Sequence, residues 1–205
     1  MDAFSSVFEI IQSADRSLFL FLNGLHCTFL DPVMFWGSKS LLWTPFFLFL
    51  FFLVIRRWGW NTIWILIFAA LMITVSDQLA NLFKEGIERL RPSHEPGLVN
   101  VHLVNGYTGG KYGFYSAHAS TTMATALYLI QLLHKKYRFI IPVVVCWSVF
   151  MSFTRIYLGV HYPGDILMGW MMGSLIGWGS GWVCSKAIRR YPIIIRHKDQ
   201  RKNPA

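Results

Sequence analysis

The sequence contains few charged residues and few cysteines. Asp, Glu, Lys and Arg make up only 14% of its 205 residues, whereas hydrophobic residues make up 54% and the mean hydropathy is +0.43. Because a typical soluble domain has about 25% charged residues, this composition argues against a domain whose surface faces water. The three cysteines, Cys27, Cys146 and Cys184, are far apart in or beside apolar segments. We expect each of them to pack as a small apolar side chain. No Cys/His cluster has the spacing of a zinc site.

Several other signals are missing. The sequence has no Walker-type glycine loop and no dinucleotide-binding fingerprint. Its first residues lack the basic region of a signal peptide, so we expect no processing. The net charge of +9 could indicate a nucleic-acid partner, but the basic residues fall in short clusters between apolar segments and in the C-terminal tail. We therefore expect no nucleic-acid partner and interpret the charge as a sign of membrane topology.

Long apolar segments dominate the chain and predict membrane-spanning helices, which need roughly 20 apolar residues. Five are clear, at residues 41–55, 62–83, 120–133, 139–153 and 166–183. A sixth segment, 18–36, is interrupted by polar residues and Pro32, so it could span, re-enter or lie in the interface. The predicted fold is an all-α, polytopic transmembrane bundle of six spans, or five if the N-terminal segment is interfacial. We expect residues 1–205 to form one domain.

Four glycines in the last apolar segment are spaced four residues apart, at Gly169, Gly173, Gly177 and Gly181. Small residues at this spacing let two membrane helices approach closely. We therefore predict close helix packing along this stripe.

Basic clusters predict the orientation in the membrane. They lie at residues 56–57, at 134–138 and from 186 to 202. Positively charged residues tend to stay in the cytoplasm, and all three clusters share one side if each intervening segment crosses once. The segments 84–116 and 155–165 then lie on the opposite, external face, where the remaining polar residues gather.

Three groups of polar residues mark the external ends of the predicted spans. In the first, Lys84 and Arg91 could bind one anionic group together, although such residues can also extend to the interface merely to reach water. In the second, Ser116 and His118 open a helix whose N–H groups favour an anion. Ser116 could bind a phosphate oxygen or only cap the helix, and His118 could donate a proton.

The third group consists of Arg155, followed six and ten residues later by His161 and Asp165. A carboxylate on one ring nitrogen fixes the tautomer of an imidazole and leaves the other nitrogen free to attack. A structural His–Asp pair that caps the next helix is the alternative. Ionisable residues at membrane depth are costly and usually functional, so the three groups together favour a site.

These groups suffice for phosphate hydrolysis. Lys84, Arg91 and Arg155 suit a group with about two negative charges, and guanidinium groups match the geometry of phosphate. One imidazole can attack phosphorus while the other protonates the leaving oxygen. We therefore expect a phosphohydrolase that needs no metal and no cofactor.

The order and spacing of these residues resemble the phosphatidic-acid-phosphatase type 2 (PAP2) superfamily, the membrane lipid phosphatases related to vanadium haloperoxidases. The family motifs are K-x6-R-P, P-S-G-H and S-R-x5-H-x3-D. The first motif matches fully, from Lys84 to Arg91 and Pro92. The third has Thr154 in place of the usual Ser, and the second has Tyr115 for Pro and Ala117 for Gly. The family Gly gives a backbone N–H to the phosphate, which Ala can also do unless its φ is positive.

The resemblance implies a role for each matching residue. His161 would attack to form a phosphohistidine, Asp165 would orient it, and His118 would protonate the leaving oxygen and then activate water. The phosphate would be held by Lys84, Arg91, Ser116, Ala117 and Arg155. Family members need no metal.

The expected substrate is a lipid phosphate or diphosphate within the bilayer: undecaprenyl diphosphate, phosphatidylglycerol phosphate, phosphatidic acid or a phosphate of lipid A. We expect an integral protein of the bacterial cytoplasmic (inner) membrane with its active site on the periplasmic face. Two alternatives remain open: a lipid phosphotransferase that uses the same intermediate, and a non-catalytic lipid-binding relative. The oligomeric state is open.

Overall fold

The computed structural model describes residues 3–193, and its regular structure there is helical. The α-helices are α1 Ala3–Asn23, α2 Leu30–Gly37, α3 Thr44–Trp58, α4 Thr62–Ile87, α5 Ala117–Leu133, α6 Ile140–Tyr157 and α7 Pro163–Arg190. Four short 3-10 helices, Ser40–Trp43, Gly59–Asn61, Pro92–His94 and Val104–Gly106, lie between them. The predicted all-α fold is confirmed.

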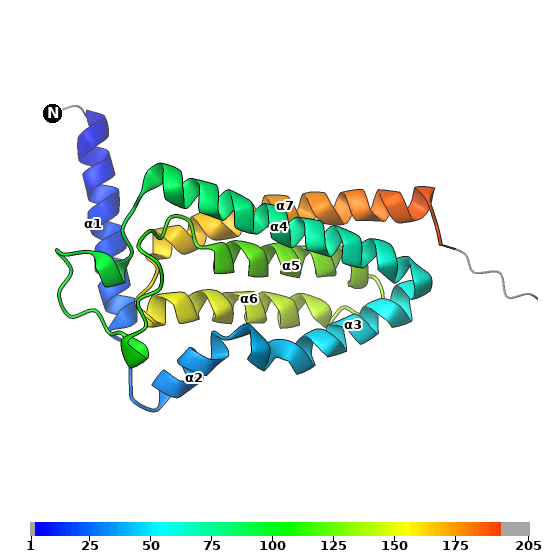
Figure 1. The fold of residues 1–205 in the computed structure, drawn as a ribbon, viewed down its shortest axis with the longest axis horizontal. Helices are drawn as coiled ribbons and strands as arrows, with labels where there is room; N and C mark the ends of the chain where they lie inside the picture. Colours follow the sequence, from blue (N-terminus) through cyan, green and yellow to red (C-terminus); the bar gives the residue numbers. More distant parts are fainter. Residues whose placement is uncertain (1–2, 194–205) are drawn as a thin grey trace, which may run out of the picture.

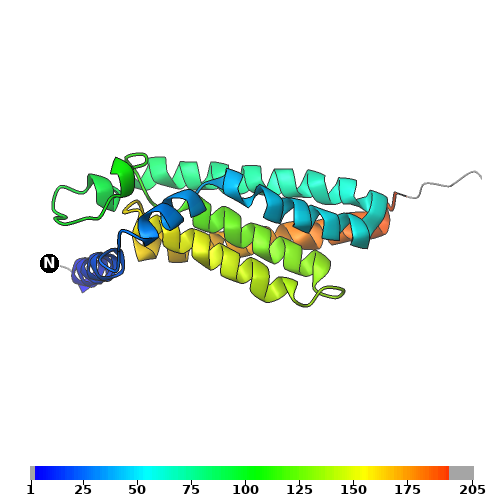
Figure 2. The same cartoon turned by 90° about the horizontal axis from the view of Figure 1, so that it is seen from below.

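Helices α3 to α7 lie side by side along the long axis of the molecule (Figures 1 and 2). Their ranges match the five apolar segments predicted from the sequence. Helix α5 is central and packs against α4, α6 and α7. Large apolar side chains on the outside of this bundle, such as Leu71, Leu82 and Leu175, are exposed. An extensive apolar surface of this kind is unfavourable in water and suits contact with lipid.

The segment 18–36 is not one continuous helix. Helix α1 ends at Asn23, and α2 begins only at Leu30. Helix α1 runs across one end of the bundle instead of along it, as both views show (Figures 1 and 2). The Asn23 side-chain amide donates to the carbonyls of Ile156 (3.0 Å) and Tyr157 (2.9 Å), at the last turn of α6. The end of α1 is therefore fixed to the end of the bundle.

Two helical stretches among the described residues are long and apolar enough to cross a membrane by length and composition: Ser40–Ile87, which contains α3 and α4, and Ile140–Tyr157. The six-span prediction is not confirmed by this criterion.

The glycine stripe of α7 packs directly on the backbone of α5. A Cβ atom at Gly169 would lie 2.7 Å from the carbonyl oxygen of Ser116, and one at Gly173 would overlap the carbonyl oxygen of Ser120. One at Gly177 would overlap the carbonyl oxygen of Ala124 in the same way. The predicted close packing is confirmed.

Replacing Gly173 by alanine should destabilise the bundle, because the new methyl group meets backbone atoms that have no rotamer to escape into. Overpacking of this kind costs about 1–3 kcal/mol. Gly179→Ala is the matched control, since nothing lies within 4 Å of a Cβ at that position of the same helix. Thermal unfolding in detergent should show a lower midpoint for Gly173→Ala and an equal or higher one for Gly179→Ala, because alanine favours a helix over glycine. Equal midpoints would contradict the packing described here.

Candidate active site

The predicted residues come together at the end of the bundle that carries α1 and the segment 88–116. A cavity of about 760 Å³ opens there, and its lining includes Lys84, Arg91, Ala117, His118, Arg155 and His161. Two further predicted residues, Ser116 and Asp165, are fully buried beside it. Residues from four separate parts of the chain thus form one site.

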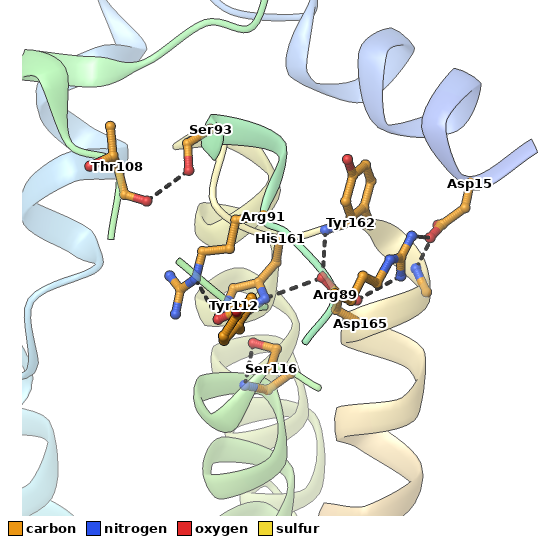
Figure 3. Close-up of polar contacts among 12 residues, drawn as sticks. Asp15, Arg89, Arg91, Ser93, Thr108, Tyr112, Ser116, His161, Tyr162 and Asp165 are labelled. Carbon is orange, nitrogen blue, oxygen red and sulfur yellow. Dashed lines mark hydrogen bonds and ion pairs between the residues drawn. The ribbon is translucent and has the colours of Figure 1, made fainter. Parts of the chain in front are cut away.

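His161 and Asp165 lie on either side of the start of α7. Pro163 opens this helix, and the Asp165 Oδ2 atom accepts a hydrogen bond from the Tyr162 N–H at 3.0 Å. The same oxygen lies 3.4 Å from Nδ1 of His161, as Figure 3 shows. Hydrogen bonds between catalytic groups are often this long before substrate binds. Nε2 is left as the ring nitrogen without a hydrogen-bond partner among the described residues.

The environment of His161 keeps its ring neutral. Only 2% of this residue is exposed. Burial lowers the pKa of His161 to about 4, although the neighbouring Asp165 opposes that shift. The unprotonated imidazole, which is the form able to attack phosphorus, therefore predominates at neutral pH.

Arg91 is held by two backbone carbonyls of one neighbouring segment, those of residues 111 and 112. Its side-chain Nε donates to the carbonyl of Tyr112 at 3.0 Å, and its backbone N–H donates to the carbonyl of Lys111 at 3.1 Å. Gly109, with a φ of +66°, leaves space for the guanidinium, because a Cβ atom there would overlap Nη1 of Arg91. The Nη groups donate to no acceptor among the described residues and are free to bind an anion.

Gly113 is a site residue that the sequence did not indicate. A Cβ atom at this position would lie 3.0 Å from Cγ of Arg91, 3.3 Å from Oδ2 of Asp165 and 3.6 Å from Nδ1 of His161. A side chain here would therefore crowd three predicted site residues at once.

Arg155 is almost completely buried, with 3% exposed. Its Nη2 donates to the carbonyl of Ser38 at 3.1 Å, and its Nε donates to the Thr154 hydroxyl at 3.3 Å. That hydroxyl in turn donates to the carbonyl of Met151 at 2.7 Å. Thr154, which replaces the Ser of the family motif, keeps the hydroxyl group at this position.

The first residues of α5 lie beside these cations. Ser116 is the N-cap, with its hydroxyl accepting the Ala119 N–H at 3.4 Å, and its own N–H donates to the Asp165 carbonyl at 3.1 Å. Ala117 is the first helical residue and is not among the described residues with positive φ. Its N–H has no intrahelical acceptor and remains available to an anion. Tyr115 is buried and packs against Phe83, with ring centroids 5.3 Å apart.

Lys84 lies in the last turn of α4, where its Nζ donates to Oδ1 of Asn81 at 3.3 Å. Asn81 in turn donates to Asp77, one turn earlier, at 3.3 Å.

Within residues 3–193, no group of three or more His, Cys, Asp or Glu side chains is arranged to hold a metal ion.

Arg89 is a second residue that the sequence analysis missed. Its Nη1 atom donates to Oδ1 of Asp165 at 2.7 Å (Figure 3). No pattern in the sequence singles out Arg89, which lies two residues after the end of α4 and outside the family motifs. Its partner Asp165 lies 76 residues further along the chain.

The cavity continues from the site into the bundle. Beyond the polar residues, its lining comes mainly from α3, α4 and α5 and includes Phe47, Leu50, Val54, Leu66, Ala69 and Met72. A charged end and an apolar remainder suit an amphiphilic ligand.

Comparison with known proteins agrees with this geometry. A model of the PAP2 superfamily matches residues 64–189. The lipid A 4'-phosphatase of Bacteroides thetaiotaomicron is 36% identical over 174 residues, covering 83% of this chain and 76% of that protein. The lipid A 4'-phosphatase of Porphyromonas gingivalis is 35% identical over 174 residues, covering 82% of this chain and 72% of that protein.

Solved structures show the same fold at low sequence identity. A transmembrane PAP2-type phosphatidylglycerolphosphate phosphatase from Bacillus subtilis superposes with a TM-score of 0.66 at 20% identity, covering 89% of each chain. LpxE from Aquifex aeolicus superposes with a TM-score of 0.61 at 22% identity, covering 83% of this chain and 93% of that one. Together with the family match over most of the chain, these similarities show that the chain belongs to the PAP2 superfamily and is an integral membrane lipid phosphatase.

Proposed function

We propose that this phosphatase hydrolyses a lipid phosphate through a phosphohistidine on His161. Nε2 of His161 attacks phosphorus, the bond between phosphorus and the lipid oxygen breaks, and that oxygen takes a proton from His118. A water molecule then attacks the phosphohistidine and gives a proton to His118. The N–P bond breaks, and phosphate leaves with His161 restored.

The remaining site residues would stabilise charge in this reaction. Lys84, Arg91 and Arg155 line the cavity with His161 and would bind the phosphate oxygens. The backbone N–H of Ala117 and the hydroxyl of Ser116 would add hydrogen bonds at the start of α5. Asp165, beside Nδ1 of His161, would stabilise the positive charge that develops on the ring.

The single observation that carries this proposal is the continuity of the cavity. The same cavity contains the two histidines, the three cations and an apolar part between α3, α4 and α5. A lipid could place its phosphate at His161 while its chains remain among apolar side chains, so the head group alone would leave the hydrocarbon region.

A phosphate of lipid A is the first substrate to test. Two relatives that are at least 35% identical over most of this chain are lipid A 4'-phosphatases. A more distant relative, 33% identical over 116 residues, is the phosphatidylglycerophosphatase B of Bacillus subtilis. Phosphatidylglycerol phosphate is therefore the second substrate, followed by phosphatidic acid and undecaprenyl diphosphate.

For the topology, we propose five membrane crossings by α3 to α7 in the bacterial cytoplasmic membrane, with α1 on the external face and the site beside it. This is the five-span alternative of the sequence analysis, with residues 1–205 as one domain. It is supported by the position of α1 across the end of the bundle. The basic pairs Arg56–Arg57 and Arg189–Arg190 lie in the last turns of α3 and α7, away from the site.

The test is phosphate release by the purified protein in detergent with EDTA present. Lipid A bisphosphate, phosphatidylglycerol phosphate, phosphatidic acid and undecaprenyl diphosphate are compared at equal mole fraction with a water-soluble phosphate monoester, and His161→Ala serves as the blank. Metal-independent release that favours one lipid over the soluble ester supports the proposal and identifies the lipid. Release from none of the lipids would refute it, and transfer of phosphate to an added alcohol without free phosphate would favour a phosphotransferase.

A further inference from the structure

Arg89 lies between two carboxylates. Its Nη1 donates to Oδ1 of Asp165 at 2.7 Å, and its Nη2 donates to Oδ2 of Asp15 at 2.6 Å (Figure 3). Its guanidinium also lies over the ring of Tyr162, 4.2 Å from the ring centroid. The side chain is 20% exposed, while those of Asp15 and Asp165 are 12% and 0% exposed. Burial opposes the charge on Arg89, but the two carboxylates outweigh that effect and raise its pKa.

This arginine is placed differently from the proposed phosphate-binding cations. Arg91 and Arg155 line the cavity, but Arg89 is not part of its lining. Both Nη atoms of Arg89 already have carboxylate partners. A group in this position acts on the reaction through Asp165 and not through the substrate.

The bond to Arg89 determines which way the Asp165 carboxylate faces. One oxygen, Oδ1, is bound to the guanidinium. The other, Oδ2, is left to accept the Tyr162 N–H and to face Nδ1 of His161. Without Arg89, the carboxylate could rotate about its bond to Cβ, and the orientation of the imidazole would no longer be fixed.

Asp15 extends this arrangement to α1. While Oδ2 binds Arg89, its Oδ1 accepts the N–H of Gly164 at 2.7 Å, at the start of α7. A Cβ atom at Gly164 would lie 2.8 Å from Oδ2 of Asp15, so only glycine leaves room for this contact. The helix that crosses the end of the bundle therefore contacts both the support of Asp165 and the helix that carries Asp165.

We propose that Arg89 and Asp15 are positioning residues for the nucleophile, and that α1 completes the active site by holding Arg89 against Asp165. This inference rests on the proposed role of His161. It assigns α1 a part in the reaction, in addition to any contact with the membrane surface.

The test compares kcat and KM of Arg89→Gln, Arg89→Lys and Asp15→Asn on the preferred lipid. Misplacing a catalytic group by about 1 Å costs about 10²-fold, so Arg89→Gln should lose about that factor in kcat with KM within about twofold. Arg89→Lys should recover part of the loss, because it keeps the charge but not the two-pronged geometry. Asp15→Asn, of the same size as the native residue, should lower kcat by about tenfold.

The matched control is Arg16→Gln. Arg16 follows Asp15 on α1 and forms a more exposed ion pair with Glu95 at 3.3 Å. This variant removes a contact between the same helix and the same loop without touching Asp165, so its kcat should be unchanged. If Arg89→Gln does not fold, the comparison of kcat between Asp15→Asn and Arg16→Gln is sufficient as the test.

A second readout separates positioning from general structural damage. The NMR signals of the histidine side chains, assigned by their loss in His161→Ala, should show wild-type His161 titrating near pH 4. In Arg89→Gln the midpoint should move upward, because the charge of Asp165 is no longer shared with a guanidinium. It should stay in place in Arg16→Gln.

The outcomes distinguish this inference from the proposed function. If the wild type releases no phosphate, or if His161→Ala keeps its activity, the proposed function fails. If both behave as expected but Arg89→Gln and Asp15→Asn match Arg16→Gln in kcat and in the His161 titration, the positioning role is refuted. A rise in KM with unchanged kcat would also refute it, because that result marks a substrate-binding residue.

Discussion

Replacing His161 by alanine should lower phosphate release by about 10⁴-fold or more, in line with the loss seen when a covalent nucleophile is removed. The reason is that no other described side chain both lines the cavity and is paired with Asp165. Steady-state release from the preferred lipid, with EDTA present, measures the effect. It should be the largest of any single substitution in the site.

His134→Ala is a suitable control for this experiment. His134 lies at the other end of α5, where Nδ1 interacts with the carbonyl of Ile130 at 2.6 Å. It is also a histidine at the end of a membrane helix, but it does not line the cavity. Activity that survives His161→Ala at more than a few per cent of the wild type would rule out His161 as the nucleophile.

Replacing His118 by alanine should separate the two halves of the reaction. Loss of a general acid–base group typically costs about 10²–10⁴-fold with a poor leaving group. A nitrophenyl phosphate needs no proton on its leaving oxygen, so the first half should still proceed. Hydrolysis of the proposed phosphohistidine, in which we assign the activation of water to His118, should then be slow. Intact-protein mass spectrometry after acid-free quenching should show one added phosphoryl group in His118→Ala.

The double variant His118→Ala, His161→Ala is the control for this adduct and should remain unmodified. An adduct that persists in the double variant would locate the phosphoryl group on another residue. Complete absence of an adduct in His118→Ala, despite nitrophenol release, would argue for direct attack by water.

The helices, and the grouping of most candidate site residues around one cavity, could be predicted because their signals are local. Apolar segments of sufficient length became α3 to α7, and the glycines spaced by four on α7 became a contact with α5. Lys84, Arg91, His118, Arg155 and His161 occur at fixed spacings near helix ends, and they line one cavity. In these cases the residue type and its place near the end of an apolar segment carried the information.

The rest depended on contacts between distant parts of the chain. The segment 18–36 had enough apolar residues for a span, but Asn23 binds the last turn of α6, and α1 ends there. Nothing around Asp15 indicates that its carboxylate meets Arg89, 74 residues further along the chain. Gly113 resembles any loop glycine until its neighbours Arg91 and His161 are known.

The close approach of α5 and α7 also bears on how new specificities could arise in this protein. Ser116, His118 and Asp165 lie at the starts of two helices whose backbones touch through glycines, so this contact fixes the backbone positions of the three residues relative to one another. The apolar part of the cavity comes largely from α3 and α4, which are outside that pair. Substitutions there could alter the choice of lipid by evolution or design while the proposed catalytic groups keep their spacing.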